Sequence, residues 1–165
     1  MLRPWEPGDP AAPDTRLRGG AFDLEVWVHD GEAARPVATG DAIRPGDRVG
    51  FRVKARADGH LLVAGVDREG HVYVCYPQGA SDGSAPFAAT AEPVELDQAM
   101  RFDAVPGEER LVAFFCDVPI TLAEVAPRLR AESTALTMAD ALPRLRADCA
   151  QEEVVLRKTG AGGPR

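Results

Sequence analysis

The chain has 165 residues, of which 45% are hydrophobic and 27% charged, which provides enough apolar material for one hydrophobic core but not for two. Its formal net charge of −7 repels phosphate backbones and anionic lipids, so we expect no nucleic-acid partner. The longest apolar runs have the length of a strand and fall far short of the roughly 20 residues that span a bilayer, so we expect no membrane insertion.

The two ends of the chain lack a regular pattern. Residues 1–20 are rich in Pro, Gly, Asp and Arg, which is typical of a flexible lead-in or linker, and residues 160–165 form a Gly-rich tail. We therefore expect a single domain over 21–159. Because no apolar signal segment follows Met1, we expect a cytoplasmic protein if the chain is complete; a fragment of a membrane-anchored protein would be extracytoplasmic.

Strand patterns dominate the chain between its ends. Alternating apolar and polar residues, separated by Gly, Pro and Asp turns, predict strands over 22–28, 33–37, 49–55, 60–66 and 71–76. The segment 60–66 is apolar on both faces, which is typical of a central strand. The turn Asp67–Gly70 joins it to 71–76 in a hairpin.

The next part of the chain is less regular. A long polar loop covers 77–86, an irregular β segment covers 94–102, and a continuous apolar strand covers 110–116. The last strand is expected over 154–158. Together with the earlier strands, these elements predict a mainly β fold, an antiparallel β-sandwich of about seven strands.

The helical pattern coincides with an internal duplication, because residues 121–132 recur as residues 137–148. Each copy opens with Thr followed three residues later by an acid, as at a capped helix start. Each copy also carries a proline, Pro127 or Pro143, six residues after that Thr. Since proline removes a backbone hydrogen bond at this depth, we expect two short helices, one in each copy, before the last strand.

Five turn motifs follow one another between about residues 40 and 116. They are Arg44–Phe51, Asp58–Leu61, Val66–Gly70, Val74–Pro77 and Val105–Glu109. In this order they resemble a function-unassigned bacterial domain family, often myxobacterial, that looks like a β-sandwich. The family is found attached to caspase-like peptidases, protein kinases, helical repeats and zinc-finger anti-sigma-type regulators. The resemblance implies an accessory domain and no catalytic residues.

The sequence offers no recognisable catalytic arrangement. His71 and Cys75 lie four residues apart on one strand, about 13 Å at 3.3 Å per residue, which is too far for a catalytic dyad. The Asp residues fall mostly in turns, which their side chains stabilise, and no D-x-D-x-D-G spacing of a calcium loop occurs. We expect a protein that is not an enzyme, with no cofactor and no metal site.

Exposed aromatic and polar residues indicate where a partner would bind. Trp27 lies on the polar face of the first strand, so that face is covered either by the C-terminal helices, which we favour, or by a partner. His60 is expected to face Tyr76 across the hairpin. The candidate interaction surface consists of Trp27, His60, Tyr76, Gln78 and Asp82.

The three cysteines bear on the cellular compartment. Cys75 lies in an apolar run and is expected to be a buried hydrophobic residue. For Cys116 and Cys149 two alternatives stay open. Either each is a buried hydrophobic residue, or the two form a disulfide that joins a strand end to the C-terminal segment in an oxidising compartment.

Two functions follow from these patterns. The leading one is a non-catalytic interaction or sensory module of a bacterial regulatory system, which contacts another protein or a fused domain. The alternative is a small-ligand or glycan-binding domain at the cell envelope.

Overall fold

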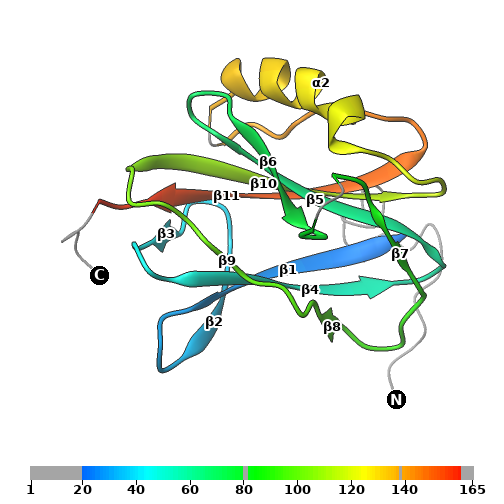
Figure 1. Ribbon diagram of the computed structural model, residues 1–165, viewed down its shortest axis with the longest axis horizontal. Helices are drawn as coiled ribbons and strands as arrows, with labels where there is room; N and C mark the ends of the chain where they lie inside the picture. Colours follow the sequence, from blue (N-terminus) through cyan, green and yellow to red (C-terminus); the bar gives the residue numbers. More distant parts are fainter. Residues whose placement is uncertain (1–19, 80–81, 138, 161–165) are drawn as a thin grey trace, which may run out of the picture.

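A computed structural model describes residues 20–79, 82–137 and 139–160. Over these residues the protein is mainly β, with eleven strands in two sheets and one helix. Figure 1 shows the two sheets as layers, with the helix on the outer side of the upper layer. The expected mainly β composition is confirmed, whereas the expected number of strands and of helices is wrong for the described residues.

Sheet A is the lower layer in Figure 1. Its strand order is β2 (Ala34–Val37), β1 (Phe22–His29), β4 (Arg48–Ala55) and β8 (Val94–Glu95), and β9 (Met100–Arg101) also pairs with β4. The two long strands, β1 and β4, alternate apolar and polar residues. Their apolar side chains face sheet B and their polar side chains face away from it.

Sheet B is the upper layer. Its described strands are, in order, β3 (Ala42–Ile43), β11 (Cys149–Lys158), β10 (Gly107–Cys116), β5 (Gly59–Asp67) and β6 (Val72–Tyr76), with β7 (Ala85–Phe87) also paired to β5. The pairs are antiparallel except for β3 with β11, which is parallel. The expectation of a purely antiparallel arrangement is therefore wrong at this edge.

The strands β5 and β10 are buried on both faces. Leu61 and Val63 belong to an inner core between the two sheets, while Leu62 and Ala64 belong to an outer core beneath the helix α2 (Leu122–Thr134). The helix α2 is neither long nor apolar enough to cross a membrane.

The hairpin of β5 and β6 has the expected elements. Asp67 Oδ1 accepts hydrogen bonds from the backbone N–H groups of Glu69 and His71, at 2.9 Å each, and so closes the turn. Gly70 has a φ of +90°, a conformation that favours glycine. The register shifts between Val63 and Ala64, which is a β-bulge.

The first copy of the duplication forms α2, but the second copy does not form a helix. Thr121 and Glu124 make the expected capping box, and α2 continues through Pro127. Residues 135–148 instead form an irregular segment, which we call the strap; its Met138 lies outside the described residues. The expectation of two short helices is therefore wrong.

Side chains of β10 and β11 provide hydrogen bonds to the backbone of the strap. Arg110 donates to the carbonyl groups of Thr137 and Asp140, at 3.0 Å each. In the other direction, two side chains of β11 accept bonds from strap N–H groups: Glu153 Oε1 from Leu142 at 2.7 Å and Gln151 Oε1 from Leu145 at 3.1 Å. Backbone groups that a helix would have used within itself are therefore satisfied by the sheet.

The two copies fold differently although both carry apolar residues at helical spacing. In α2, Val125 and Leu129 lie four residues apart and are both buried, as on one face of a helix. The second copy has Ala141 in the place of Val125, and Ala141 is exposed while Leu142 and Leu145 are buried. A helix would place Leu142 and Leu145, three residues apart, on one face as well, so the side-chain bonds from β10 and β11, and not a missing apolar stripe, hold the second copy in its irregular conformation.

We predict that Val63→Asp unfolds the domain, because Val63 is fully buried between the sheets. The substitution buries an uncompensated charge, at a cost on the order of several kcal/mol. We expect Leu62→Asp to do the same beneath α2. Thermal melting followed by circular dichroism measures the effect, with Arg68→Asp in the exposed turn of the same hairpin as the control. Melting of Val63→Asp at the wild-type temperature would contradict the assignment.

Candidate binding surfaces

The outer face of sheet A has Trp27 near its centre. The cross-strand neighbours of Trp27 are Pro36 on β2 and Gly50 on β4. The guanidinium carbon of Arg52 lies 3.9 Å from the centroid of the Trp27 ring, in a cation–π contact. The Nε1 atom of Trp27 is buried without a hydrogen-bond partner among the described residues. We call this surface the Trp27 face.

The helix does not cover the Trp27 face, so the expectation that C-terminal helices cover Trp27 is wrong. The apolar residues Val125 and Leu129 of α2 pack against the outer core on sheet B, which is apolar, whereas the outer face of sheet A is polar. An amphipathic helix packs where its apolar stripe is buried, and this places α2 on the opposite side of the molecule from Trp27.

A cavity of about 320 Å³ lies at one end of the Trp27 face. It is lined by His29, Arg48, Glu95, Leu96, Asp97 and Ala99. The Nε2 atom of His29 lies 3.8 Å from Glu95 Oε1. His29 and Arg48, which are cross-strand neighbours on the same outer face as Trp27, therefore belong both to this face and to the lining of the polar cavity.

The other residues expected at an interaction surface lie apart from Trp27. His60 is paired with Pro86 and Cys116, while Tyr76 is paired with Val63, so the expected contact of His60 with Tyr76 is wrong. The reason is the short strand β7, which occupies the place beside His60 that the hairpin was expected to fill.

Gln78 and Asp82 form hydrogen bonds that hold loop segments in place. Gln78 N–H donates to Gln98 Oε1 at 2.6 Å, and Gln98 Nε2 donates to the Gln78 carbonyl at 3.3 Å. The carbonyl of Asp82 accepts the N–H of Leu122 at 2.9 Å, at the start of α2. Asp82 is thus on the helix side of the molecule and Trp27 is on the other.

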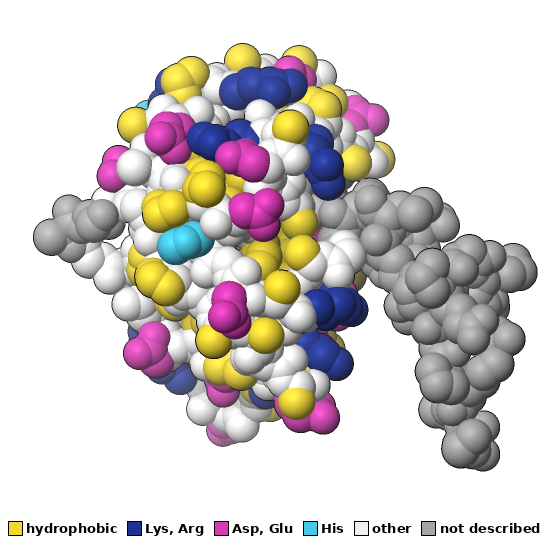
Figure 2. Space-filling model, turned by 90° about the vertical axis from the view of Figure 1, so that its right-hand side faces the viewer, with side chains coloured by type: hydrophobic (Ala, Val, Ile, Leu, Met, Phe, Trp, Pro, Cys, Tyr) yellow, Lys and Arg dark blue, Asp and Glu magenta, His cyan; other side chains and the backbone are white. Residues whose placement is uncertain are grey.

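The end of the molecule on the right in Figure 1 faces the viewer in Figure 2. Hydrophobic side chains alternate there with acidic and basic ones, and none of these kinds forms a large continuous area. This mixed surface favours no particular class of ligand.

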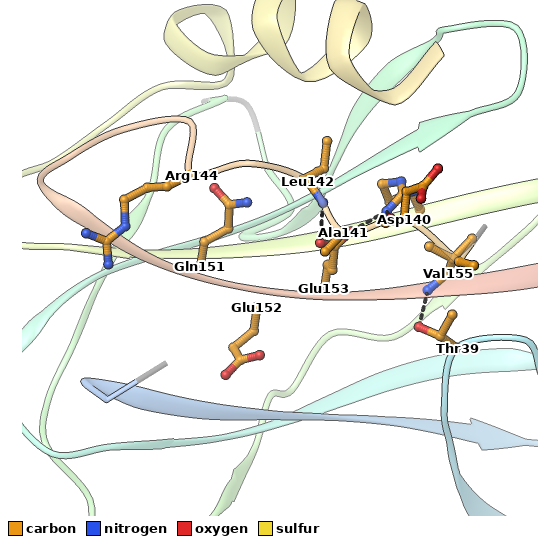
Figure 3. A pocket seen from close by; sticks show the side chains of 11 residues that line it. Thr39, Asp140, Ala141, Leu142, Arg144, Gln151, Glu152, Glu153 and Val155 are labelled. Atoms are coloured by element: carbon orange, nitrogen blue, oxygen red, sulfur yellow. Dashed lines mark hydrogen bonds and ion pairs between the residues drawn. The ribbon is translucent and has the colours of Figure 1, made fainter. Parts of the chain in front are cut away.

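A groove of about 480 Å³ lies between the strap and β11 (Figure 3). Its walls are formed by Thr39, Arg110, residues 139–142, Arg144, residues 151–153 and Val155. Figure 3 shows Gln151 and Glu153 directed toward the strap and Glu152 directed toward sheet A. Arg110 is buried and forms an ion pair with Glu153, so the floor of the groove holds a paired charge.

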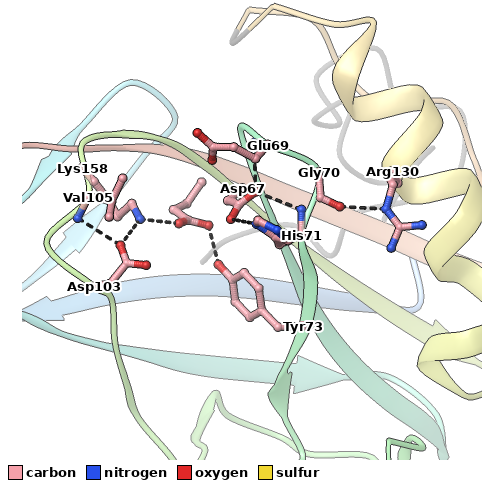
Figure 4. A network of polar contacts seen from close by, with 10 residues as sticks. Asp67, Glu69, Gly70, His71, Tyr73, Asp103, Val105, Arg130 and Lys158 are labelled. Atoms are coloured by element: carbon pink, nitrogen blue, oxygen red, sulfur yellow. Dashed lines mark hydrogen bonds and ion pairs between the residues drawn. The ribbon is translucent and has the colours of Figure 1, made fainter.

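A cluster of charged side chains lies at the end of the β10–β11 pair that is far from Cys116 and Cys149 (Figure 4). Lys158 Nζ donates to Glu109 Oε1 at 2.7 Å and to Asp103 Oδ1 at 2.6 Å, and Tyr73 donates its hydroxyl to Glu109 Oε2 at 2.5 Å. The side chains of Lys158 and Glu109 are 6% and 4% exposed, while that of Asp103 is 68% exposed. The cluster joins β6, β10 and β11 to the loop after β9.

The protonation states follow from these contacts. Burial disfavours the charged form of Lys158, but its bonds to Asp103 and Glu109 outweigh burial and raise the pKa of Lys158. The bond from Lys158 lowers the pKa of Asp103. Burial raises the pKa of Tyr73 and of the Cys75 thiol, and the nearby Glu109 raises both further. Cys75 is therefore a neutral thiol at neutral pH and a poor nucleophile.

The turn of the β5–β6 hairpin brings Asp67, Glu69 and His71 together, with one donor atom of each within 4.8 Å of the others. Asp67 Oδ2 lies 2.9 Å from His71 Nδ1, in addition to the two backbone bonds at Oδ1. Burial acts to raise the pKa of Asp67, but the hydrogen bonds from His71 and Glu69 lower it. The Asp67 carboxylate therefore stabilises the hairpin turn through these hydrogen bonds.

Cys116 and Cys149 form a disulfide at one end of the β10–β11 pair. They are directly opposite each other, with Cα atoms 4.1 Å apart, and both side chains are buried beneath α2. The disulfide closes the segment that contains α2 and the strap. Cys75 is free and buried between the sheets, as the sequence predicts.

Comparison with known proteins found no match: no family model, no curated protein and no solved structure is similar to this chain.

We predict that the Lys158–Asp103 bond makes the protein acid-sensitive. Because the pKa of Asp103 is lowered in the folded state, the stabilisation is present above pH 4 or so and is lost as the pH falls through the folded pKa. Melting temperatures between pH 2 and pH 7 should therefore fall more steeply for the wild type than for Asp103→Asn. Parallel curves for the two proteins would contradict the prediction.

We predict that the purified chain is oxidised between Cys116 and Cys149. Alkylation of the unfolded, unreduced chain should label Cys75 alone, and intact mass spectrometry should show one added group. Reduction should lower the free energy of unfolding by about 4 kcal/mol, the loop-closure value for a separation of 33 residues. Three labelled thiols without reductant would disprove the disulfide.

Proposed function

We propose that this chain is a non-catalytic β-sandwich module of a bacterial regulatory system, which binds a partner protein or a fused domain through the Trp27 face. One observation carries the proposal. The outer face of sheet B is covered by α2 and the strap, whereas no described element covers the outer face of sheet A, although a Trp lies at its centre.

The composition of the Trp27 face supports a protein partner. Trp and Arg are the residues most enriched among those that dominate binding energy at protein interfaces, and here Trp27 and Arg52 are stacked. The same face carries four basic and three acidic side chains on a chain whose net charge is −7. With Asp97 of the adjoining cavity the acidic side chains also number four, so this face is suited to a partner surface of mixed charge. The basic residues are Arg48, Arg52, Lys54 and Arg101, and the acidic ones are Asp23, Glu25 and Glu95.

The resemblance to an accessory-domain family supports the regulatory setting of the proposal. Members of that family occur beside peptidases, kinases and anti-sigma-type regulators, so the partner we propose is a domain of this kind, fused to this chain or encoded beside it.

A second candidate is a small-ligand or glycan-binding domain at the cell envelope. The cavity of about 320 Å³ at one end of the Trp27 face favours it, because a hollow lined by polar side chains is suited to a sugar or a similar polar ligand. The disulfide favours the same reading, since disulfides persist in oxidising compartments.

We predict that Trp27→Ala weakens binding of the fused or neighbouring domain by about 2 kcal/mol, roughly thirtyfold, as measured by titration calorimetry. Val118→Ala is the matched control, because Val118 is 45% exposed and lies next to α2, away from the Trp27 face. Folding of each variant is checked by thermal melting.

The same variants decide between the two candidates. A panel of neutral and acidic oligosaccharides that binds the wild type but not Trp27→Ala, without binding of the protein domain, would favour the envelope ligand. Equal binding by the wild type and Trp27→Ala for every probe would disprove the Trp27 face as the contact surface.

A further inference from the structure

Three side chains of the metal-ligating types meet at the turn between β5 and β6. Asp67, Glu69 and His71 alternate with other residues along the chain, and one ligand atom of each lies within 4.8 Å of the others. The three side chains also line one cavity of about 210 Å³. An ion in this cavity is therefore within reach of two carboxylates and one imidazole.

The distance between Asp67 and His71 fits two ligands of one metal ion. Asp67 Oδ2 lies 2.9 Å from His71 Nδ1. Zn²⁺ binds carboxylate oxygen and imidazole nitrogen at about 2.0–2.2 Å, so two neighbouring ligand atoms lie about 3–3.5 Å apart. A shift of about 0.5 Å or less therefore brings both atoms onto the same ion.

Glu69 supplies a carboxylate that the turn itself does not use. Asp67 and His71 are hydrogen-bonded to each other, whereas the exposed side chain of Glu69 makes no hydrogen bond or ion pair with a described residue. Stabilisation of the turn therefore accounts for two of the three side chains and leaves Glu69 without a role. Because its carboxylate is unpaired, Glu69 can rotate toward the other two without breaking a contact.

The turn holds Asp67 and His71 in place without an ion. Asp67 Oδ1 accepts the N–H groups of Glu69 and His71 at 2.9 Å each, which leaves Oδ2 on the side of the imidazole. Arg130 of α2 donates from Nε to the Gly70 carbonyl at 2.8 Å and so fastens the turn to the helix (Figure 4). In metal sites, ligating carboxylates are commonly oriented by such outer hydrogen bonds.

The charges around the cavity favour a cation. Four acidic and two basic side chains line it, and one of the basic ones, Lys158, is already paired with Glu109 and Asp103. The cavity therefore keeps an excess of negative charge, which attracts a divalent cation. The acidic side chains are Asp67, Glu69, Asp103 and Glu108, and the basic ones are Arg68 and Lys158.

We propose that Asp67, Glu69 and His71 bind a divalent first-row metal ion, for which Zn²⁺ is the probe. The nitrogen ligand decides the class of metal, because Ca²⁺ and Mg²⁺ prefer oxygen ligands, whereas imidazole suits Zn²⁺ and similar ions. Three protein ligands leave at least one coordination position for water or for a donor atom of a bound molecule.

The site was not expected from the sequence, because the spacing of a calcium loop is absent and the three ligands here suit a different ion. It lies on the β5–β6 hairpin of sheet B, whereas the proposed function concerns the outer face of sheet A. The metal site therefore stands or fails independently of the proposed function.

The first experiment titrates ZnCl₂ into the full, untagged, oxidised chain and measures binding by calorimetry. We expect one ion per chain, bound at least about tenfold more weakly by His71→Ala and by Glu69→Gln, since loss of even an outer partner of a ligand costs about 10–100-fold. Both side chains are exposed, and melting curves check that the variants fold.

Two control variants separate ligands from nearby groups. His60→Ala removes another histidine of the same strand and should bind Zn²⁺ like the wild type. Glu108→Gln removes a charge that lines the same cavity and should weaken binding less than Glu69→Gln does. Absence of Zn²⁺ binding, equal affinity of the wild type and His71→Ala, or a loss in Glu108→Gln as large as that in Glu69→Gln would overturn the proposal.

The second experiment records the ring nitrogen resonances of the three histidines by NMR on the ¹⁵N-labelled chain. Zn²⁺ should shift the ring resonances of His71 with the metal on Nδ1 and leave those of His29 and His60 unchanged. A turn-closing hydrogen bond alone predicts no zinc-dependent change. Metal on His29 or His60, or unchanged resonances of His71, would refute the assignment.

The third experiment tests the class of metal and separates metal binding from turn stability. Ca²⁺ and Mg²⁺ should bind at least about tenfold more weakly than Zn²⁺, and binding of Ca²⁺ as tight as that of Zn²⁺ would rule out the proposed class. Zn²⁺ should raise the melting temperature of the wild type but not that of His71→Ala. If His71 only stabilised the turn, the two proteins would differ by the same amount with and without Zn²⁺.

Discussion

The fold depends on the burial of β5 and β10 on both faces. Each fully buried Leu, Val or Phe side chain contributes on the order of 1.5–3 kcal/mol relative to its exposed state, and these two strands supply such side chains in both directions. One sheet can cover only one face. Sheet A therefore covers one face of these strands, and the amphipathic helix α2 covers the other face. The outer surfaces of sheet A and α2 are polar.

The charged residues within sheet B determine what happens at its two ends. Arg110 and Lys158 are buried, and a buried charge requires a partner with good hydrogen-bond geometry. Arg110 finds Glu153 and two strap carbonyls, which holds the strap over β11. Lys158 finds Glu109 and Asp103, which fastens the loop after β9 to the last strand. The conformations of both irregular segments thus depend on paired charges.

The Trp27 face is left uncovered because the described chain has few elements outside its two sheets. The helix covers the apolar outer face of β5 and β10, and the strap lies over polar side chains of β11, so no described element remains to cover the Trp27 face. The strap lies across β11 because its backbone is bonded by the side chains of Gln151 and Glu153.

Local pattern was sufficient to predict β1, β4, β10 and the hairpin of β5 and β6, but it predicted only 154–158 of β11, which begins at Cys149. Period-two alternation identifies a strand and its buried face from neighbouring residues alone, and the turn chemistry of Asp67 and Gly70 is equally local. The start of α2 was predicted for the same reason, since the capping box lies within four residues. The short strands β3, β7, β8 and β9 were missed or merged, because pairs of two or three residues leave no periodic signal.

The candidate sites depended on contacts between distant residues. The likeness of the two copies was visible in the sequence, but the irregular conformation of the second copy rests on the polar residues of β10 and β11 beneath the strap. The location of α2 on sheet B rather than over Trp27 is likewise set by which surface is apolar once the sheets have assembled. The sequence by itself determined the strands, the central hairpin and one helix start, because these depend on neighbours along the chain. Only the tertiary structure decided which sheet face the helix covers and which face stays exposed, because that depends on which surfaces are apolar after the two sheets have packed together.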